Sequence, residues 1–386
     1  MNQPRTIPFG RPWITDDDRK AVMEVLDGPI LTHGPQCKAF EAEFAAFMGK
    51  DAHAVTMSSC MGALHMAYFA LGIGPGDEVL VPAQTHTATA HAVELVGARP
   101  IFVDCDPATG NVTADRLAAA VTPKTKALSV VHFLAIPCAM PDIMRVAAKH
   151  RLKVIEDCAL AIGSRYEDRH VGLFGDAGCF SFYPVKHITT AEGGMLVTKD
   201  KAFAESVARK RGFGVDRTHS ERSIPGMYEV PQLGLNYRMS ELQAALGRSQ
   251  MRRIEENLSR RRRNFESLKK ALEGQGAARV LDSADPRQKS SHYCLSVVLE
   301  GKLAGRRNEL VGKLNAAGVG TSVYYPAPVP RMRYYADKYG YDASRYPEAA
   351  RISDCSVALP VGQHLSPEDV DYIGKVFVET VKEMRV

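Results

Sequence analysis

A lysine, Lys186, lies four residues after an apolar run, "CFSF" at residues 179–182, that indicates a buried strand. Pro184 prevents strand pairing at its own position, and Gly193 and Gly194 let the backbone turn sharply or approach another surface closely. A lysine in this place is either a surface group whose stem is covered or an amine kept for chemistry. The remaining residues decide between these interpretations.

Further polar groups follow other predicted strands. Asp157 closes the run 153–157, His86 follows the run 78–81, and Ser58 and Ser59 open a helix after the run 53–57. Ligands of an open parallel sheet bind at the carboxyl ends of its strands, and the first N–H groups of a helix suit a phosphate. A carboxylate, a flat ring, a helix N-terminus and an amine together match the requirements of pyridoxal phosphate.

Alternating strands and helices predict an α/β fold with a mostly parallel sheet. At 386 residues the chain exceeds what one core usually supports. We expect a large domain over 1–250 and a smaller α+β domain over 251–386, joined by a long helical segment, as one helix or two in line. The predicted strands are 53–57, 78–81, 100–104, 127–133, 153–157, 293–300 and 320–325. The predicted helices are 16–26, 38–48, 61–71, 87–96, 114–120, 140–150, 306–317 and 366–383.

Composition narrows the functional classes. The net charge of +5 is small, and the one dense basic cluster, Arg260–Arg263, lies among glutamates and indicates a solvated helix face rather than a nucleic-acid interface. The eight cysteines form no CxxC pair, which favours reduced core residues over disulfides or a metal site. With no stretch of 18 apolar residues and no signal-peptide pattern, we expect a soluble, cytoplasmic protein without a membrane partner.

Several longer motifs resemble the DegT/DnrJ/EryC1/StrS family of pyridoxal-phosphate-dependent sugar aminotransferases, which have fold type I with a seven-stranded type of sheet. The resemblance spans nearly the whole chain. Its markers are "GPILTHGP" (28–35), "SSCMGALHMAYFALGIGPGDEVLVP" (58–82), "VIEDCALAIGSRY" (154–166), "GDAGCFSFYPVKHITTAEGGMLVT" (175–198), "LGLNYRMSELQAALG" (233–247) and "LSPEDVDYI" (365–373).

The resemblance implies a role for each matching residue. Lys186 is the lysine that forms the Schiff base and moves protons, and Asp157 is the partner of the pyridine nitrogen. His86 takes the place of the aromatic residue that covers the ring. Asn236 matches an asparagine that reaches the phosphate of the neighbouring subunit, which implies a homodimer with shared active sites. The residues implied at the subunit's own phosphate are Ser59, Cys60, Met61 and Ser181.

The chain departs from the family pattern at several positions. Cys60-Met61 replaces Gly-Thr, so backbone N–H groups are left to hold the phosphate. Leu160 replaces a Gln or His, which leaves either another group to tune the Schiff base or a drier pocket. Ala191 replaces a glycine, and Tyr324 replaces a histidine near the sugar. Three residues are candidates for substrate contacts: His33, His187 and Tyr324.

The resemblance implies transfer of an amino group from glutamate to a keto group of a nucleotide-linked 4-keto-6-deoxy sugar. Alternatives within the family are a deoxysugar dehydratase and an aminotransferase for another keto sugar or a cyclitol. The dehydratases replace the lysine with histidine, so Lys186 favours transamination. A non-catalytic relative would lack the lysine or the carboxylate, and a dinucleotide-binding oxidoreductase would show GxGxxG after its first strand.

Overall fold

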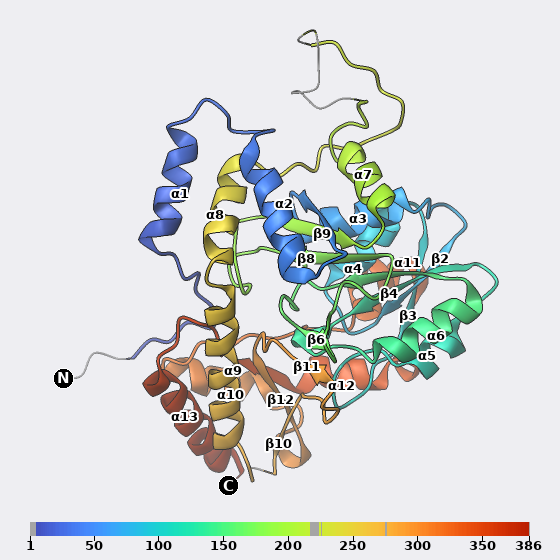
Figure 1. The fold of residues 1–386 in the computed structure, drawn as a ribbon. Coiled ribbons are helices and arrows are strands. Elements are labelled where there is room, and N and C mark those ends of the chain that lie inside the picture. Colours follow the sequence, from blue (N-terminus) through green and yellow to red (C-terminus); the bar gives the residue numbers. More distant parts are fainter. Residues whose placement is uncertain (1–4, 217–223, 225, 275, 386) are drawn as a thin grey trace.

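A seven-stranded sheet forms the centre of the computed structural model, which describes residues 5–216, 224, 226–274 and 276–385. Its strands are β1 (His53–Met57), β2 (Glu78–Pro82), β3 (Arg99–Val103), β4 (Thr125–Val131), β5 (Lys153–Asp157), β8 (Ala177–Ser181) and β9 (Gly194–Thr198). The strand order is β1-β9-β8-β5-β4-β2-β3 (Figure 1). Only β9 runs antiparallel to its neighbours among these described strands. The mostly parallel sheet predicted from the sequence is confirmed.

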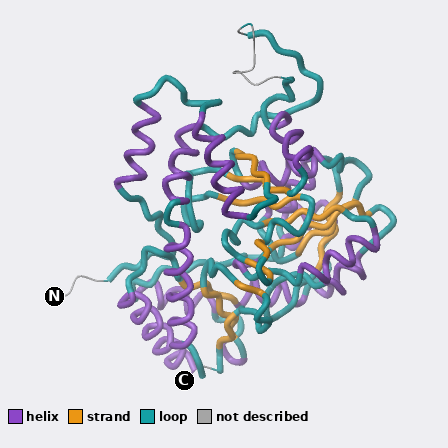
Figure 2. The backbone as a smooth tube through the Cα atoms, viewed as in Figure 1, coloured by secondary structure: helices purple, strands orange, loops and turns teal. Residues whose placement is uncertain are grey.

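Helices cover both faces of this sheet. Successive residues of a strand point to opposite faces, so each strand packs apolar side chains against the helices on either side. In β4, Leu128 and Val130 pack with the helices on one face, whereas Ala127 belongs to the larger cluster on the other. Figure 2 shows the strands enclosed between helices. The helices of this part are α1 (Asp16–Leu26), α2 (Pro35–Met48), α3 (Cys60–Ala70), α4 (Thr87–Leu95), α5 (Ala114–Ala120), α6 (Met140–His150) and α7 (Lys201–Lys210).

The C-terminal part contains a three-stranded antiparallel sheet with the order β10-β12-β13, formed by Ala278–Val280, Leu295–Leu299 and Ser356–Leu359. Its helices are α10 (Arg307–Ala316), α11 (Arg333–Tyr339), α12 (Pro347–Cys355) and α13 (Pro367–Arg385). A third small sheet joins β6 (Arg165–Tyr166), β7 (Arg169–His170) and β11 (Gln288–Lys289). Two helices in line, α8 (Glu241–Met251) and α9 (Ile254–Ala271), run from the first part to this one (Figure 1). The division into two domains near residue 250 stays a prediction.

Two expectations about the C-terminal part were wrong. The run 320–325 forms no strand; Ser322 makes one isolated bridge to Ala358 because the chain then turns away at two prolines in the segment 326–328. The basic cluster is not uniformly solvated either, because Arg261 is 4% exposed and faces the interior of the molecule. Arg262 and Arg263 do lie in solvent.

Other local expectations hold. The helix predicted over 16–26 is α1, and a capping box opens it, with the Thr15 N–H donating to the Asp18 carboxylate over 2.9 Å. All eight cysteines are buried. Among the described helices, none combines the length and the apolar character that crossing a membrane requires.

Candidate active site

Asp157 lies at the carboxyl end of β5 in the centre of the sheet and is 5% exposed. Its Oδ2 accepts a hydrogen bond of 2.8 Å from the Thr89 hydroxyl of α4, and its Oδ1 accepts one of 3.0 Å from the Ala159 N–H. The Thr89 hydroxyl in turn lies 2.7 Å from that of Thr85. Both carboxylate oxygens are therefore held in fixed directions, and the carboxylate is positioned before any ligand binds.

A second buried carboxylate lies on the neighbouring position of β5. Glu156 accepts hydrogen bonds from the N–H groups of Gly172, Phe174 and Gly175 and pairs with His132 Nε2 at 3.0 Å. His132 Nδ1 accepts the N–H of Cys138, so the ring donates through Nε2. Because these hydrogen bonds occupy both side chains, Glu156 and His132 hold the segment 172–175 between β5 and β8 in place and leave no atoms free to bind a metal ion.

The N-terminus of α3 faces the same end of the sheet. Ser59 caps the helix by accepting the Gly62 N–H over 3.0 Å, whereas the N–H groups of Cys60 and Met61 have no partner within the helix. Gly194 of β9 comes very close: a Cβ there would lie 2.4 Å from the carbonyl carbon of Ser59 and 2.6 Å from the Cys60 nitrogen. Position 194 must therefore be a glycine, because any side chain there would collide with the backbone of Ser59 and Cys60.

Lys186 lies in the loop after β8, where its N–H donates to the Tyr183 carbonyl over 2.9 Å. Its Nζ lies 5.0 Å from the centre of the Tyr293 ring. Burial lowers the pKa of the Lys186 amine to about 8, against smaller opposing effects of Cys60 and Asp157. An amine with such a pKa has a far larger neutral, nucleophilic fraction near neutral pH than an ordinary lysine.

Electrostatic effects show that these groups lie within reach of one another's charges. Partial burial lowers the pKa of the His86 imidazole, while Asp157 raises it and Lys186 lowers it further. Burial raises the pKa of the Cys60 thiol, with Asp157 acting in the same direction and Lys186 opposing it. The predicted grouping of Lys186, Asp157, His86 and Cys60 is therefore present in the fold.

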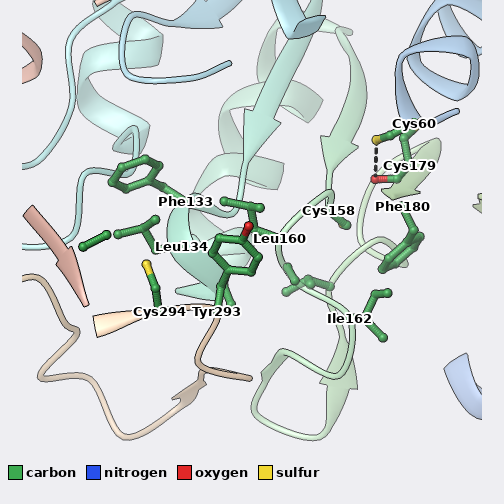
Figure 3. Packing of buried hydrophobic residues seen from close by; sticks show 14 of the residues in the cluster. Cys60, Phe133, Leu134, Cys158, Leu160, Ile162, Cys179, Phe180, Tyr293 and Cys294 are labelled. Atoms are coloured by element: carbon green, nitrogen blue, oxygen red, sulfur yellow. Dashed lines mark hydrogen bonds between the residues drawn. The ribbon is translucent and has the colours of Figure 1, made fainter. Parts of the chain in front are cut away.

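His86 and Ser181 both lie at the carboxyl edge of the sheet, at the start of α4 and at the end of β8. His86 caps α4, accepting the Ala88 N–H at Nδ1 over 3.1 Å, and its ring meets that of Tyr325 edge-on at 5.5 Å. Ser181 is the last residue of β8, pairs with Gly194 of β9 and is 7% exposed. The Cys60 thiol donates to the Cys179 carbonyl over 3.5 Å, which ties α3 to β8 (Figure 3).

The residues proposed to contact the substrate lie in different surroundings. His187 is fully buried and Nε2 donates to the Ser291 carbonyl over 3.1 Å. Tyr324 shares a hydrogen bond of 2.9 Å between hydroxyl groups with Tyr293, next to Lys186. His33 is exposed in the loop between α1 and α2. Substrate contacts by His33, His187 and Tyr324 stay predictions.

Leu160 and Tyr293 belong to the buried cluster drawn in Figure 3. Leu160 is 4% exposed, so the position where the family has a polar side chain is apolar and sealed from water in this chain. The sequence left two possibilities for this position: another group tunes the Schiff base, or the pocket is drier. The burial of Leu160 favours the drier pocket.

Asn236 is exposed and precedes α8. It forms an isolated bridge with Gly212, and the next residue, Tyr237, accepts the Ser58 N–H over 2.8 Å. Asn236 is therefore at the surface, and it lies near the N-terminus of α3 in its own subunit. Its reach to a neighbouring subunit stays a prediction.

Sequence reasoning missed two residues that position the site. Thr89 fixes Asp157, and Tyr293 covers Lys186. Thr89 carries a weak signal, since it lies one helical turn after Thr85 at the start of a helix that follows a strand. Tyr293 carries none, because it lies more than 100 positions after Lys186 and is brought close only by the packing of the C-terminal part.

These groups fit pyridoxal phosphate. The free N–H groups at the start of α3, the close approach of Gly194 and the Ser181 hydroxyl suit a phosphate. The fixed Asp157 carboxylate suits a protonated pyridine nitrogen, and the low-pKa amine of Lys186 suits attack on an aldehyde.

Comparison with known proteins gives the class. Residues 12–378 match the model of the DegT/DnrJ/EryC1/StrS aminotransferase family. The spore coat polysaccharide biosynthesis protein SpsC of Bacillus subtilis is 37% identical over 97% of both chains. The putative sugar aminotransferase Spr1654 of Streptococcus pneumoniae, in its PMP form, has a TM-score of 0.92 with 28% identity over 98% of this chain and 100% of that one. DesI, solved in the presence of its TDP-sugar product, has a TM-score of 0.87 with 28% identity over 99% and 94%.

The fold and the site define a pyridoxal-phosphate-dependent sugar aminotransferase. The chain belongs to the DegT/DnrJ/EryC1/StrS aminotransferase family. The predictions of family, enzyme class and cofactor are confirmed.

Proposed function

We propose that the protein transfers the amino group of glutamate to the keto group of a nucleotide-linked 4-keto-6-deoxy sugar. The observation that carries the proposal is the proximity of the Lys186 amine, the Asp157 carboxylate and Cys60 at the N-terminus of α3, whose charges act on one another. The kinship with DesI, which was solved with a TDP-sugar product, supports the class of acceptor.

Each residue has one task in this proposal. Bound pyridoxal phosphate supplies an electron sink for the bond that is broken at the substrate carbon. Lys186 Nζ takes the proton from the Cα of the amino donor and later returns a proton to the carbon of the acceptor. Asp157 keeps the proton on the pyridine nitrogen, and the N–H groups of Cys60 and Met61 hold the phosphate together with Ser59 and Ser181. His86 covers the ring.

Exclusion of water belongs to the same mechanism. Tyr293, beside the reacting amine, and Leu160 are almost fully buried, and Tyr325 packs against the same apolar cluster. In such surroundings the neutral form of Lys186 is favoured, because desolvation penalises the ammonium ion. We assign contacts with the sugar to Tyr324, His33 and His187.

The proposal includes a homodimer with shared active sites. Large apolar side chains are exposed on α1, on the loop that follows it and on the segment before Asn236. They are Met23, Leu26, Ile30, Leu31, Phe213, Met227, Tyr228, Val230 and Leu233. Monomeric proteins rarely leave so many apolar groups in water, and a twofold axis would cover them on both copies at once. Asn236, at the end of this segment, would then reach the partner's phosphate.

A screen of acceptors tests the proposed function. The enzyme is first converted with glutamate and freed of it, and then incubated with nucleotide-linked keto sugars, other keto sugars and cyclitol ketones. We expect one amino sugar product by mass spectrometry with the wild type and none with Lys186→Ala. A product that has lost a hydroxyl group without gaining nitrogen would identify a dehydratase instead, and no product from any nucleotide-linked sugar would refute the acceptor class.

Mixed dimers test the shared site. Asn236→Asp places a negative charge beside the phosphate, and Lys186→Ala removes the amine. If Asn236 serves the partner's site, a heterodimer of these variants carries both lesions in one site and leaves the other intact. We expect mixing to restore activity that neither variant has. If heterodimers form and activity stays absent, Asn236 acts within its own subunit.

A further inference from the structure

The segment from Tyr324 to Val329 belongs to the C-terminal part and reaches the end of β2, beside the candidate active site. Two adjacent residues that follow β2 bind it. Gln84 Nε2 donates to the Tyr324 carbonyl over 3.0 Å. The Ala83 carbonyl accepts the Val329 N–H over 2.9 Å. The segment is therefore attached at both ends to the stretch of chain between β2 and His86, and the proposed mechanism uses neither contact.

The Gln84 side chain is 1% exposed, and the C-terminal part engages both ends of its amide. Its Nε2 donates to the Tyr324 carbonyl, and its Oε1 accepts the hydroxyl of Ser353, in α12, over 2.9 Å. A backbone carbonyl can only accept, so the Tyr324 contact fixes which end of the amide faces it. Loss of that contact would leave a buried polar group unsatisfied. The amide thus holds the backbone of Tyr324 in one place.

The chain after this segment continues into α11, which is hydrogen-bonded to α4 (Figure 1). The Tyr335 hydroxyl lies 2.7 Å from His91 Nδ1, and the Tyr339 hydroxyl donates to the Glu94 carboxylate. Helix α4 leads from the carboxyl end of β2 back to the start of β3, so these contacts lie progressively further from the carboxyl edge of the sheet. Gln84 is therefore the anchor of this region on the active-site side.

Tyr325, the next residue of the segment, lies among the residues of the site. Its ring meets that of His86 edge-on, with 5.5 Å between the centroids, and is 6.2 Å from the ring of Phe133. Burial raises the pKa of the Tyr325 phenol, and the nearby Asp157 carboxylate acts in the same direction. Rings in edge contact restrict each other's orientation. A shift of the backbone at position 324 would move the Tyr325 ring and remove this restraint from His86.

We infer that Gln84 is a positioning residue of the cofactor pocket, which acts through the backbone of Tyr324 to hold the Tyr325 ring against His86. The cofactor would lose part of its enclosure if the segment moved, although none of the residues proposed to bind it had changed. The inference concerns the bound cofactor and assumes neither the amino donor nor the acceptor of the proposed function. It shares with that function only the role of His86 as the residue that covers the cofactor ring.

Cofactor binding tests this inference. The dissociation constant of pyridoxal phosphate is measured by titration of the cofactor-free enzyme, and circular dichroism records the visible band of the bound cofactor. Gln84→Met keeps the length of the side chain and loses both hydrogen bonds, so we expect at least about fivefold weaker binding and a smaller dichroic band. Gln84→Glu can still accept from Ser353 but its carboxylate cannot donate to the Tyr324 carbonyl, so it should behave like Gln84→Met.

Ser353→Ala is the matched control, because it removes the other partner of the same amide and keeps the bond to Tyr324. Its cofactor affinity should stay within about twofold of the wild type. A purely structural role of Gln84 would lower the melting temperature of the cofactor-free protein and leave the affinity of the folded protein unchanged. Wild-type affinity and dichroism in folded Gln84→Met or Gln84→Glu would overturn the inference, and so would an equal loss of affinity in Ser353→Ala.

Tyr325→Ala shows whether Gln84 acts through the ring, and it decides the question even if substitutions of Gln84 prevent folding. We expect this variant to bind the cofactor at least about fivefold more weakly. In its background Gln84→Met should change the affinity by less than about twofold, because the ring that Gln84 positions is already absent. Unchanged affinity in Tyr325→Ala, or a full additional loss from Gln84→Met, would overturn the inference. His86→Ala tests the role of His86 separately, and absence of amino transfer by the wild type would count against the proposed function alone.

Discussion

The low pKa of Lys186 predicts an unusual pH dependence of stability in the enzyme freed of its cofactor. The amine has an ordinary pKa of 10.5 when the chain is unfolded and about 8 in the fold, because burial penalises its charge. Between pH 8 and 10.5 the unfolded state therefore binds more protons than the folded state. Stability contributed by this group rises with pH in that window and is lowest below pH 8.

The magnitude follows from the two values. One pKa unit corresponds to 1.36 kcal/mol, so a change from 10.5 to about 8 sets an upper limit of about 3.4 kcal/mol. Water that enters the site in the absence of cofactor screens part of this penalty, and we expect about 2 kcal/mol. Lys186→Met keeps the length of the side chain and removes the charge. The variant should be more stable than the wild type by about this amount at pH 7, and the difference should fall below about 1 kcal/mol at pH 10 and vanish above the unfolded-state pKa of 10.5.

Urea unfolding of both proteins at pH 7, 8, 9 and 10, freed of cofactor, measures the effect. Lys201→Met, at an exposed position of α7, is the control and should show no such convergence. A difference between Lys186→Met and wild type that is constant from pH 7 to pH 10 would refute the reasoning. The amine would then carry an ordinary charge in the fold, and its availability as a nucleophile would need another cause.

Three further substitutions test the framework around the site. Thr89→Val should lower the unfolding free energy by about 1–3 kcal/mol, because it leaves one buried oxygen of Asp157 without a donor. Thr89→Ser keeps the hydroxyl and should retain most of the stability. Equal losses in the two variants would contradict the role of the hydroxyl. Glu156→Gln should cost about 3 kcal/mol or more in urea unfolding, since its amide would face N–H donors, including His132 Nε2. An unchanged unfolding midpoint would show that the pair is dispensable. Ala191 has a φ of 65°, a backbone conformation that a β-branched side chain strains. Ala191→Val should therefore destabilise the fold by more than about 1 kcal/mol, while Ala191→Gly stays within about 1 kcal/mol of the wild type. A valine variant as stable as the wild type would show that this position is not strained.

Elements with strong local signals were predicted well. The strand over 153–157 ends at Asp157 in the structure, and the helix over 114–120 has the predicted bounds. Both follow from short-range patterns, a buried apolar run in one case and an N-cap with helical spacing in the other. The candidate residues Lys186 and Asp157 could be found because Asp157 ends such a strand and Lys186 follows another, at the edge where the topology of a parallel sheet brings separate residues together.

The predictions that were wrong concern residues whose positions depend on contacts between distant segments. Arg261 lies in a run of four arginines, and no local pattern distinguishes it from its exposed neighbours. Helical periodicity places it with Asn257 and Asn264 on one face of α9, and both asparagines also donate to backbone carbonyls of buried loops. This polar face could be recognised only once the loops that it contacts were placed. The strand predicted over 320–325 failed similarly, because only Ser322 bridges to Ala358, a distant residue, before the chain turns away at the prolines of the segment 326–328.

The departure at Cys60-Met61 bears on which residue constrains the proposed phosphate site. The N–H groups at the start of α3 point toward a phosphate whichever side chains those residues carry, provided that the helix keeps its place. That place is set by the backbone contact with Gly194, where even one added methyl group would collide with Ser59 and Cys60. The requirement for a small residue therefore falls on β9, more than 130 positions further along the chain. Exchange of Gly-Thr for Cys-Met at the helix start is compatible with phosphate binding, whereas any side chain at Gly194 is not.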